Sequence, residues 1–187
     1  VAKRSYEPQN LPPEIEVGLF ATDTFAPGTP CFPNGCHVVE VEIDPETGRT
    51  EILRYSVVDD VGTVINKLTL EGQIHGGIGQ AVGQALTEHM VYDKESGQLI
   101  TGSFLDYGMP RADDSCSFDL GNNPVPTKLN PIGAKGAGEA GNVGGLGAIM
   151  NAIVDALRPL GIDHIDMPAT PSRVWHAIQE AKKNSAA

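Results

Sequence analysis

Basic residues are scarce in this sequence: 13 Lys and Arg stand against 24 Asp and Glu in 187 residues, which gives a formal net charge of −11. The deficit argues against a general nucleic-acid binder or a binder of anionic membranes, because both classes act through clustered positive charge. A small anionic ligand stays compatible with the sequence, since a few local hydrogen-bond donors decide its binding.

Cysteine is also scarce, and its three copies are Cys31, Cys36 and Cys116. The C-x4-C spacing of the first two is compatible with zinc, but no second pair of ligands accompanies them. We therefore expect free thiols in a reducing cytoplasm. Long hydrophobic runs are absent too, because Gly or a charged residue interrupts each one. No membrane insertion and no secretory signal are predicted.

The apolar content of 40% is enough for one domain with a core. Residues 1–36 carry much Pro, Gly and Thr with little periodicity, and we predict an extended N-terminal segment of the kind that continues a longer chain. Residues 37–181 are predicted to form the folded lobe, and residues 182–187 a frayed tail.

The folded lobe is predicted to be α+β, with a mixed or antiparallel sheet packed by long helices in two layers. Residues 37–58 alternate apolar and polar side chains around turn residues, which indicates a β-hairpin. Apolar spacing of three to four residues predicts long helices over 66–90 and 139–157. The smaller elements expected are short strands at 90–93 and 98–100, a mixed loop at 101–114, a strand at 115–120, and a last helix that starts near Pro171 with Thr170 as its N-cap.

Glycines recur along the first long helix at a spacing of three to four residues. Each glycine inside a helix costs roughly 1 kcal/mol relative to alanine, so their presence asks for a reason. Close approach of another backbone or of a bulky cofactor would supply one, and tight helix packing alone explains them about as well. The glycines are Gly72, Gly76, Gly79 and Gly83.

The most informative stretch is residues 130–141, where a single carboxylate, Glu139, follows several glycines and a lysine at the start of a predicted helix. A glycine-rich turn lets backbone N–H groups approach a ligand closely, and a helix start adds unpaired donors. Glu139 beside a bound cofactor would be well placed to act as a general base. The structural alternative is that Glu139 only complements the helix dipole, as acidic residues in first turns commonly do.

Residues 136–141 also match the G-x-G-x-x-G pattern of dinucleotide-binding proteins. That fingerprint needs a strand just before it and an acidic residue about 20 positions later. Residues 123–131 contain three prolines instead, and no acid lies at the right offset. We interpret the match as coincidental. An unrelated nucleotide-binding domain is kept as a rival that titration with nucleotides would test.

Four separated segments together resemble one family. In order and spacing they are similar to the C-terminal part of the molybdenum-binding large subunit of the molybdenum hydroxylases, the family of xanthine dehydrogenase, aldehyde oxidase and aerobic carbon monoxide dehydrogenase. The resemblance extends over about residues 37–181. The segments are residues 58–62, 72–83, 133–139 and 167–175.

The resemblance implies an oxidoreductase lobe that contributes one wall of a molybdenum–molybdopterin site, with the pterin in a dinucleotide form. The implied reaction is hydroxylation of an aldehyde or N-heterocycle with oxygen from water, or oxidation of carbon monoxide. Glu139 would be the base, and iron–sulfur and FAD groups on partner subunits or domains would carry the electrons away. Gln73 matches a glutamine that contacts the pterin, and no residue is assigned as a metal ligand. The loop residues expected on the cofactor side are Lys135, Gly136, Ala137 and Gly138.

Some features depart from the family. The family subunit is several times longer, and most cofactor contacts and the loops that choose the substrate lie upstream. His75 stands where a family member can carry Glu, so no catalytic role is assigned to it, and Lys67 stands where relatives often have proline.

The isolated chain is therefore expected to be inactive. Its expected partners are the upstream lobe of the same subunit, an iron–sulfur subunit, a flavin subunit and a small-molecule substrate. The rival within the family is an inactive remnant that binds a partner subunit.

Overall fold

The computed structural model describes residues 1–185, and for Ser185 it describes the backbone only. The chain divides into two compact units, residues 1–30 and 31–187. The first unit contains a short helix α1 (Ala2–Ser5) and a 3-10 turn η1 (Pro8–Asn10), so its first ten residues are not extended as the sequence suggested. Residues 11–33 carry no helix or strand.

A three-stranded mixed sheet forms the first layer of the second unit, in the order β1-β2-β3. The strands β1 (Asn34–Ile43) and β2 (Thr50–Asp60) pair antiparallel, which confirms the predicted hairpin. Their register shifts between Glu40 and Val41. The strand β3 (Phe118–Asn122) joins β2 in parallel, a pairing that the sequence could not specify.

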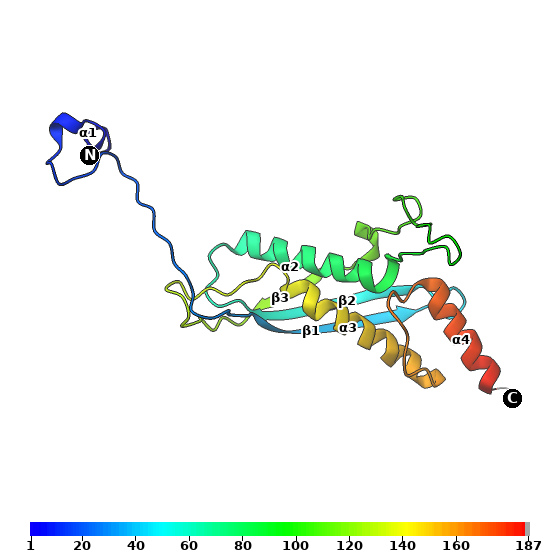
Figure 1. Cartoon of the computed structure of the whole chain (residues 1–187). Coiled ribbons are helices and arrows are strands. Elements are labelled where there is room, and N and C mark those ends of the chain that lie inside the picture. The colour runs from blue at the N-terminus through cyan, green and yellow to red at the C-terminus, as the bar shows by residue number, and fades with distance from the viewer. Residues whose placement is uncertain (186–187) are drawn as a thin grey trace. The chain divides into compact units, whose positions relative to one another are not determined.

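Two helices cover one face of the sheet: α2 (Lys67–Val82) and α3 (Ala140–Leu157) lie side by side in Figure 1. The side chain of Asn66 caps α2 by accepting a hydrogen bond from the backbone N–H of Thr69. The predicted helix over 66–90 is shorter than expected, because a π-helical turn η2 (Gly83–Thr87) follows α2 and Glu88 is already extended. The two-layer α+β fold is confirmed.

The core lies between the sheet and these helices. Tyr55 and Val57 of β2 are fully buried against Ile78 of α2 and against Ile149 and Ile153 of α3. By length and composition alone, residues 140–160 could cross a membrane, a property that the interrupting glycines hid in the sequence. The same helix supplies side chains to the core of this unit, and core helices commonly have this length and composition.

The remaining elements follow the predicted order. A single bridge between Tyr92 and Leu99 replaces two short strands, and the 3-10 turn η3 (Ala112–Asp114) lies in the loop before β3. After α3 come the 3-10 turn η4 (Arg158–Leu160) and the helix α4 (Pro171–Ser185). The Thr170 hydroxyl accepts a hydrogen bond from the Arg173 N–H, as expected of an N-cap, and α4 continues through residues 182–185.

Candidate active site

Glu139 stands at the N-cap position of α3, directly after the glycine-rich loop. Its backbone is not helical, with φ −114° and ψ 2°, and its side chain makes no capping hydrogen bond. The side chain is exposed. The carboxylate is therefore not used to cap α3, and it remains available to a ligand beside the loop.

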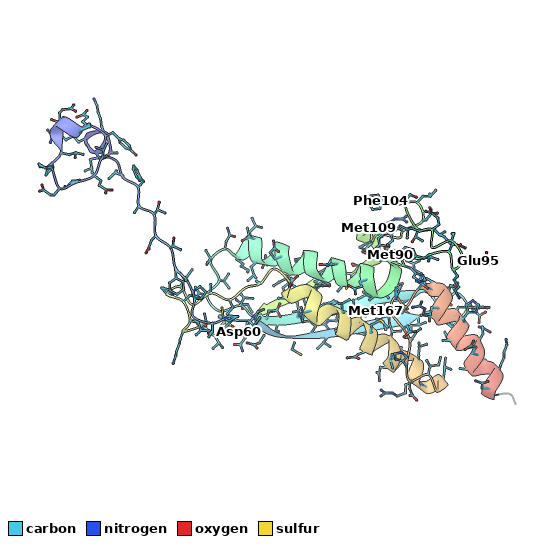
Figure 2. All side chains as sticks on the ribbon, viewed as in Figure 1. Asp60, Met90, Glu95, Phe104, Met109 and Met167 are labelled. Atoms are coloured by element: carbon cyan, nitrogen blue, oxygen red, sulfur yellow. The ribbon has the colours of Figure 1, made fainter. Side chains whose placement is uncertain are left out.

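An ion pair fixes the start of the loop. Lys135 Nζ lies 2.5 Å from Asp60 Oδ2, and the two side chains are only 10% and 14% exposed. Asp60 Oδ1 also accepts hydrogen bonds from the backbone N–H groups of Gly62 and Val125. These donors, with the Lys135 ammonium first among them, hold the pKa of Asp60 well below its usual range. Asp60 thus connects the end of β2 with the backbone at Val125 and with the glycine-rich loop at Lys135. Figure 2 shows it at the opposite end of the sheet from Phe104 and Met109.

This ion pair changes the expected role of Lys135. The sequence suggested that Lys135 lines the cofactor side of the loop, and Lys135 does line a hollow beside the loop. Its ammonium group, however, is bound to Asp60, and its backbone N–H donates to Val61 O at 2.8 Å. We infer that Lys135 positions the loop and offers little charge to a ligand.

The loop lies between two hollows. On one side is a cleft of about 490 Å³ that contains Glu139, Gly136 and Gly138. On the other side is a hollow of about 270 Å³ that contains Gln73, Lys135 and Gly138. The predicted site residues are therefore brought together around one loop, with Glu139 and Gln73 facing different sides of it.

The hollow beside Gln73 has a largely apolar lining that includes a few polar groups. Gln73 is exposed on α2, and a Cβ atom added at Gly138 would lie 3.8 Å from its Oε1 atom. No Asp or Glu is among the described residues that line this hollow; Thr63, Asn66 and Thr69 supply further polar groups.

The cleft beside Glu139 contains a cluster that the sequence did not reveal. Its walls are largely apolar, and its floor carries His37 of β1 and Asp59 of β2. His37 Nδ1 lies 2.7 Å from the hydroxyl of Tyr55, and His37 Nε2 lies 3.5 Å from Asp59 Oδ1. The alternation of β2 could have placed Tyr55 and Asp59 on the buried face, but only the hairpin register brings His37 beside them.

His75 lies outside both hollows. His75 Nδ1 lies 2.7 Å from the carbonyl of Glu71, and its ring packs on Phe118. Within residues 1–185, no group of three or more His, Cys, Asp or Glu side chains could hold a metal ion.

Comparison with known proteins gives a consistent set of matches. A family described as a molybdopterin cofactor-binding domain matches residues 1–116, a range that includes Gln73 and ends before Glu139. The carbon monoxide dehydrogenase large chain of Hydrogenophaga pseudoflava is 35% identical over 181 residues, which are 96% of this chain and 22% of that protein. The nicotine 6-hydroxylase large subunit of Paenarthrobacter nicotinovorans is 38% identical over 174 residues, 93% of this chain and 21% of that protein.

Solved structures agree with the sequence matches. A Cu,Mo-CO dehydrogenase in its carbon monoxide reduced state is similar with a TM-score of 0.88 and 35% identity, over 97% of this chain and 22% of that one. Quinoline 2-oxidoreductase from Pseudomonas putida 86 is similar with a TM-score of 0.82 and 38% identity, over 94% of this chain and 22% of that one. The chain thus spans about a fifth of the length of these relatives.

Proposed function

The chain belongs to the molybdopterin cofactor-binding family and corresponds to the C-terminal part of a molybdenum hydroxylase large subunit, and on this basis we propose that it supplies the catalytic base and one wall of the cofactor site. The reaction proposed is hydroxylation of an aldehyde or N-heterocycle with oxygen from water, or oxidation of carbon monoxide. The observation that carries the proposal is that the Glu139 carboxylate does not cap α3 and lies exposed beside an open glycine-rich loop.

The hollow on the Gln73 side fits a pterin. The Gln73 amide can both donate to and accept from a heterocycle edge. Ala137 and Gly138 present backbone without bulky side chains to this hollow. Absence of carboxylates from this hollow suits a cofactor that carries phosphate, including a dinucleotide form.

When bound, the molybdenum cofactor supplies the two-electron oxidant and the water-derived oxygen. The part of this chain would be to receive a proton: the Glu139 carboxylate is placed to accept one as a general base. The ion pair of Asp60 and Lys135 holds the loop in place. It thereby keeps the Glu139 carboxylate at a fixed position relative to the loop residues that would contact the cofactor.

Partners and setting follow from the relatives. Several are called large chains, a large subunit or subunit gamma of a complex, which supports assembly with other subunits. We propose iron–sulfur and flavin subunits or domains as the electron acceptors, and the remainder of the large subunit as the other wall of the site. The cysteines Cys31, Cys36 and Cys116 are unpaired, which is compatible with the reducing cytoplasm that we propose.

The inactive, partner-binding remnant remains the second candidate. It differs from the first in one measurable way, since a remnant would not need a proton acceptor at residue 139. Assaying molybdenum in the assembled subunit would show whether the chain helps to hold the cofactor. Genes for an iron–sulfur and a flavin subunit beside its own would favour the enzyme.

The test is Glu139→Gln in the complete enzyme. This change keeps the size and the hydrogen-bonding shape of the side chain and removes its basic site, so turnover should fall by at least about 100-fold. Cofactor content and melting temperature should stay close to wild type. Glu180→Gln, an exposed change on α4, is the matched control and should keep full activity.

A purely structural Glu139 gives a different result. As a first-turn residue that complements the helix dipole, it would contribute roughly 0.3–1 kcal/mol of stability. The substitution would then lower the melting temperature slightly and leave turnover near normal. That outcome would remove Glu139 as the base.

A further inference from the structure

The floor of the Glu139 cleft is built from a chain of three polar side chains. Tyr55 contacts His37, and His37 contacts Asp59, at 2.7 Å and 3.5 Å. All three point from the hairpin toward α3 and are almost completely buried; Asp59 is 3% exposed. Burial of polar side chains costs free energy unless the groups are paired. A buried chain of three such groups is therefore a particular feature of this site.

Glycines make room for the chain of side chains. A Cβ atom at Gly35, which pairs with Asp59 across the hairpin, would collide with the Asp59 carboxylate. A Cβ atom at Gly144 of α3 would collide with the His37 ring. The first turns of α3 therefore rest directly on this cluster, one turn beyond Glu139.

The proton positions follow from the environment of Tyr55. Burial first, and the charge of Asp59 second, raise the pKa of the Tyr55 phenol well above its usual value. A phenol that keeps its proton can donate it to His37 Nδ1, which leaves Nε2–H to face Asp59. The His37 ring thus lies between the Tyr55 phenol and the Asp59 carboxylate.

Two carboxylates line the cleft. Asp59 Oδ2 is buried and has no hydrogen-bond partner among the described residues. Glu139 adds a second carboxylate on the wall of the same cleft. Of the described residues that line it, none is Lys or Arg, and the neighbouring Lys135 is bound to Asp60. The hollow on the other side of the loop differs, because no carboxylate is among the described residues that line it.

We propose that the Glu139 cleft selects its ligand by charge, accepting neutral or cationic N-heterocycles and amines and disfavouring molecules that carry a carboxylate or a phosphate. Asp59 acts through its field, and Tyr55 and His37 hold it in place. This inference rests on the proposed function, since it names the charge class of the substrate that Glu139 would meet.

The experiment measures binding to the 187-residue chain with three matched probes at neutral pH. They are (pyridin-3-yl)methylammonium, pyridine-3-carboxamide and pyridine-3-carboxylate, which share one ring and differ in charge. Dissociation constants come from ¹⁵N NMR shifts of the backbone amides of Gly35, Gly138 and Val143. We expect the cation to bind at least about tenfold more tightly than the anion, with the neutral probe between them.

Variants separate the cleft from the overall negative charge of the chain. Asp59→Asn should reduce the cation-to-anion preference to about threefold or less, whereas Asp119→Asn, an exposed change on β3, removes the same charge elsewhere and should leave the preference unchanged. If Asp59→Asn does not fold, Glu139→Gln takes its place, because that side chain is exposed.

Three results would overturn the proposal: tighter or equal binding of the anion, an unchanged preference in the cleft variant, or no shift of the cleft amides by any probe. The readout does not involve turnover. Failure of Glu139 as a base in the complete enzyme would therefore leave this result standing, and the reverse also holds.

Discussion

Asp60 is the residue on which the geometry of the loop depends most. Its carboxylate binds the Lys135 ammonium and two backbone N–H groups, from Gly62 and Val125. Sequence reasoning singled out Glu139 and the glycines because their chemistry is local. It assigned no role to Asp60, because two of the three partners of Asp60 lie 65 and 75 positions away along the chain.

Asp60 should make stability fall at acid pH. The pKa of Asp60 is lowered in the folded state, so the unfolded chain binds the proton more readily. The stability that the Asp60 carboxylate contributes is therefore fully present above the ordinary pKa of about 3.9, and it is lost as pH falls through the folded-state pKa. Urea unfolding at about pH 5 and pH 3 should show a smaller loss of stability in Asp60→Asn than in wild type. Asp119→Asn, whose ion pair with Arg54 is exposed, should keep the wild-type loss. Identical losses in wild type and Asp60→Asn would contradict this role.

The three polar residues of the cleft floor show why part of the site was hidden. His37 and Tyr55 are separated by 18 positions. Their contact depends on a hairpin register that shifts between Glu40 and Val41, and such a shift is not written in the alternation of apolar residues. The contacts of a histidine in one strand therefore could not be predicted until the register of the partner strand was known.

The elements with the strongest periodicity were predicted best. The hairpin, α3 and the start of α4 lie within a few residues of their expected positions. The helix over 66–90 was predicted too long, because the π-helical turn after Val82 depends on tertiary contacts: the Ala85 carbonyl accepts a hydrogen bond from Ala169. Local sequence does not show such a contact.

The glycines of α2 have a different explanation from the one expected. A Cβ atom at Gly72, Gly76 or Gly79 would meet nothing within 4 Å in this structure. The close approach of α2 and α3 occurs at Gly77 instead, where a Cβ atom would lie 2.9 Å from Asn142 N and 3.0 Å from Gly141 Cα. The crossing is thus made by a glycine outside the regular series, and packing within this chain does not account for Gly72, Gly76 and Gly79.

Alanine substitutions distinguish these glycines. Gly77→Ala should destabilise the chain by about 1–3 kcal/mol, since the added methyl group forces the two helices apart and outweighs the gain in helix propensity. Gly76→Ala, its neighbour in open space, should stabilise the chain by up to about 1 kcal/mol. Chemical denaturation of both variants measures the difference. A Gly77→Ala variant at least as stable as wild type would mean that the helices do not cross here.

The chain as a whole offers one side of a cofactor site. Its hollow beside Gln73 presents a few hydrogen-bond donors, each worth roughly 0.5–1.5 kcal/mol net, which is little against the entropy lost on binding a large cofactor. We expect the isolated chain to retain no molybdenum and no pterin after gel filtration, as measured by metal analysis and pterin fluorescence. Stoichiometric recovery of both would show that this side of the site is sufficient.

The outer face of the hairpin should make the isolated chain associate. Val38 and Val58 are 63% and 48% exposed, and Cys36 and Ser56 pair with them across the two strands on this face. Exposed apolar side chains of this kind favour contact with another surface, which in the isolated chain is a second copy. Static light scattering should therefore show a mass that rises with protein concentration.

Charge placed on this face should reverse the association. Val38→Lys with Val58→Lys places two like charges on it and should give a concentration-independent monomer, provided that the circular dichroism spectrum is unchanged. The control is Ile15→Lys, which adds a charge at an exposed apolar residue of the first unit and should leave the association as in wild type. A wild-type chain that scatters as a monomer at every concentration would mean that this face does not bind a second copy.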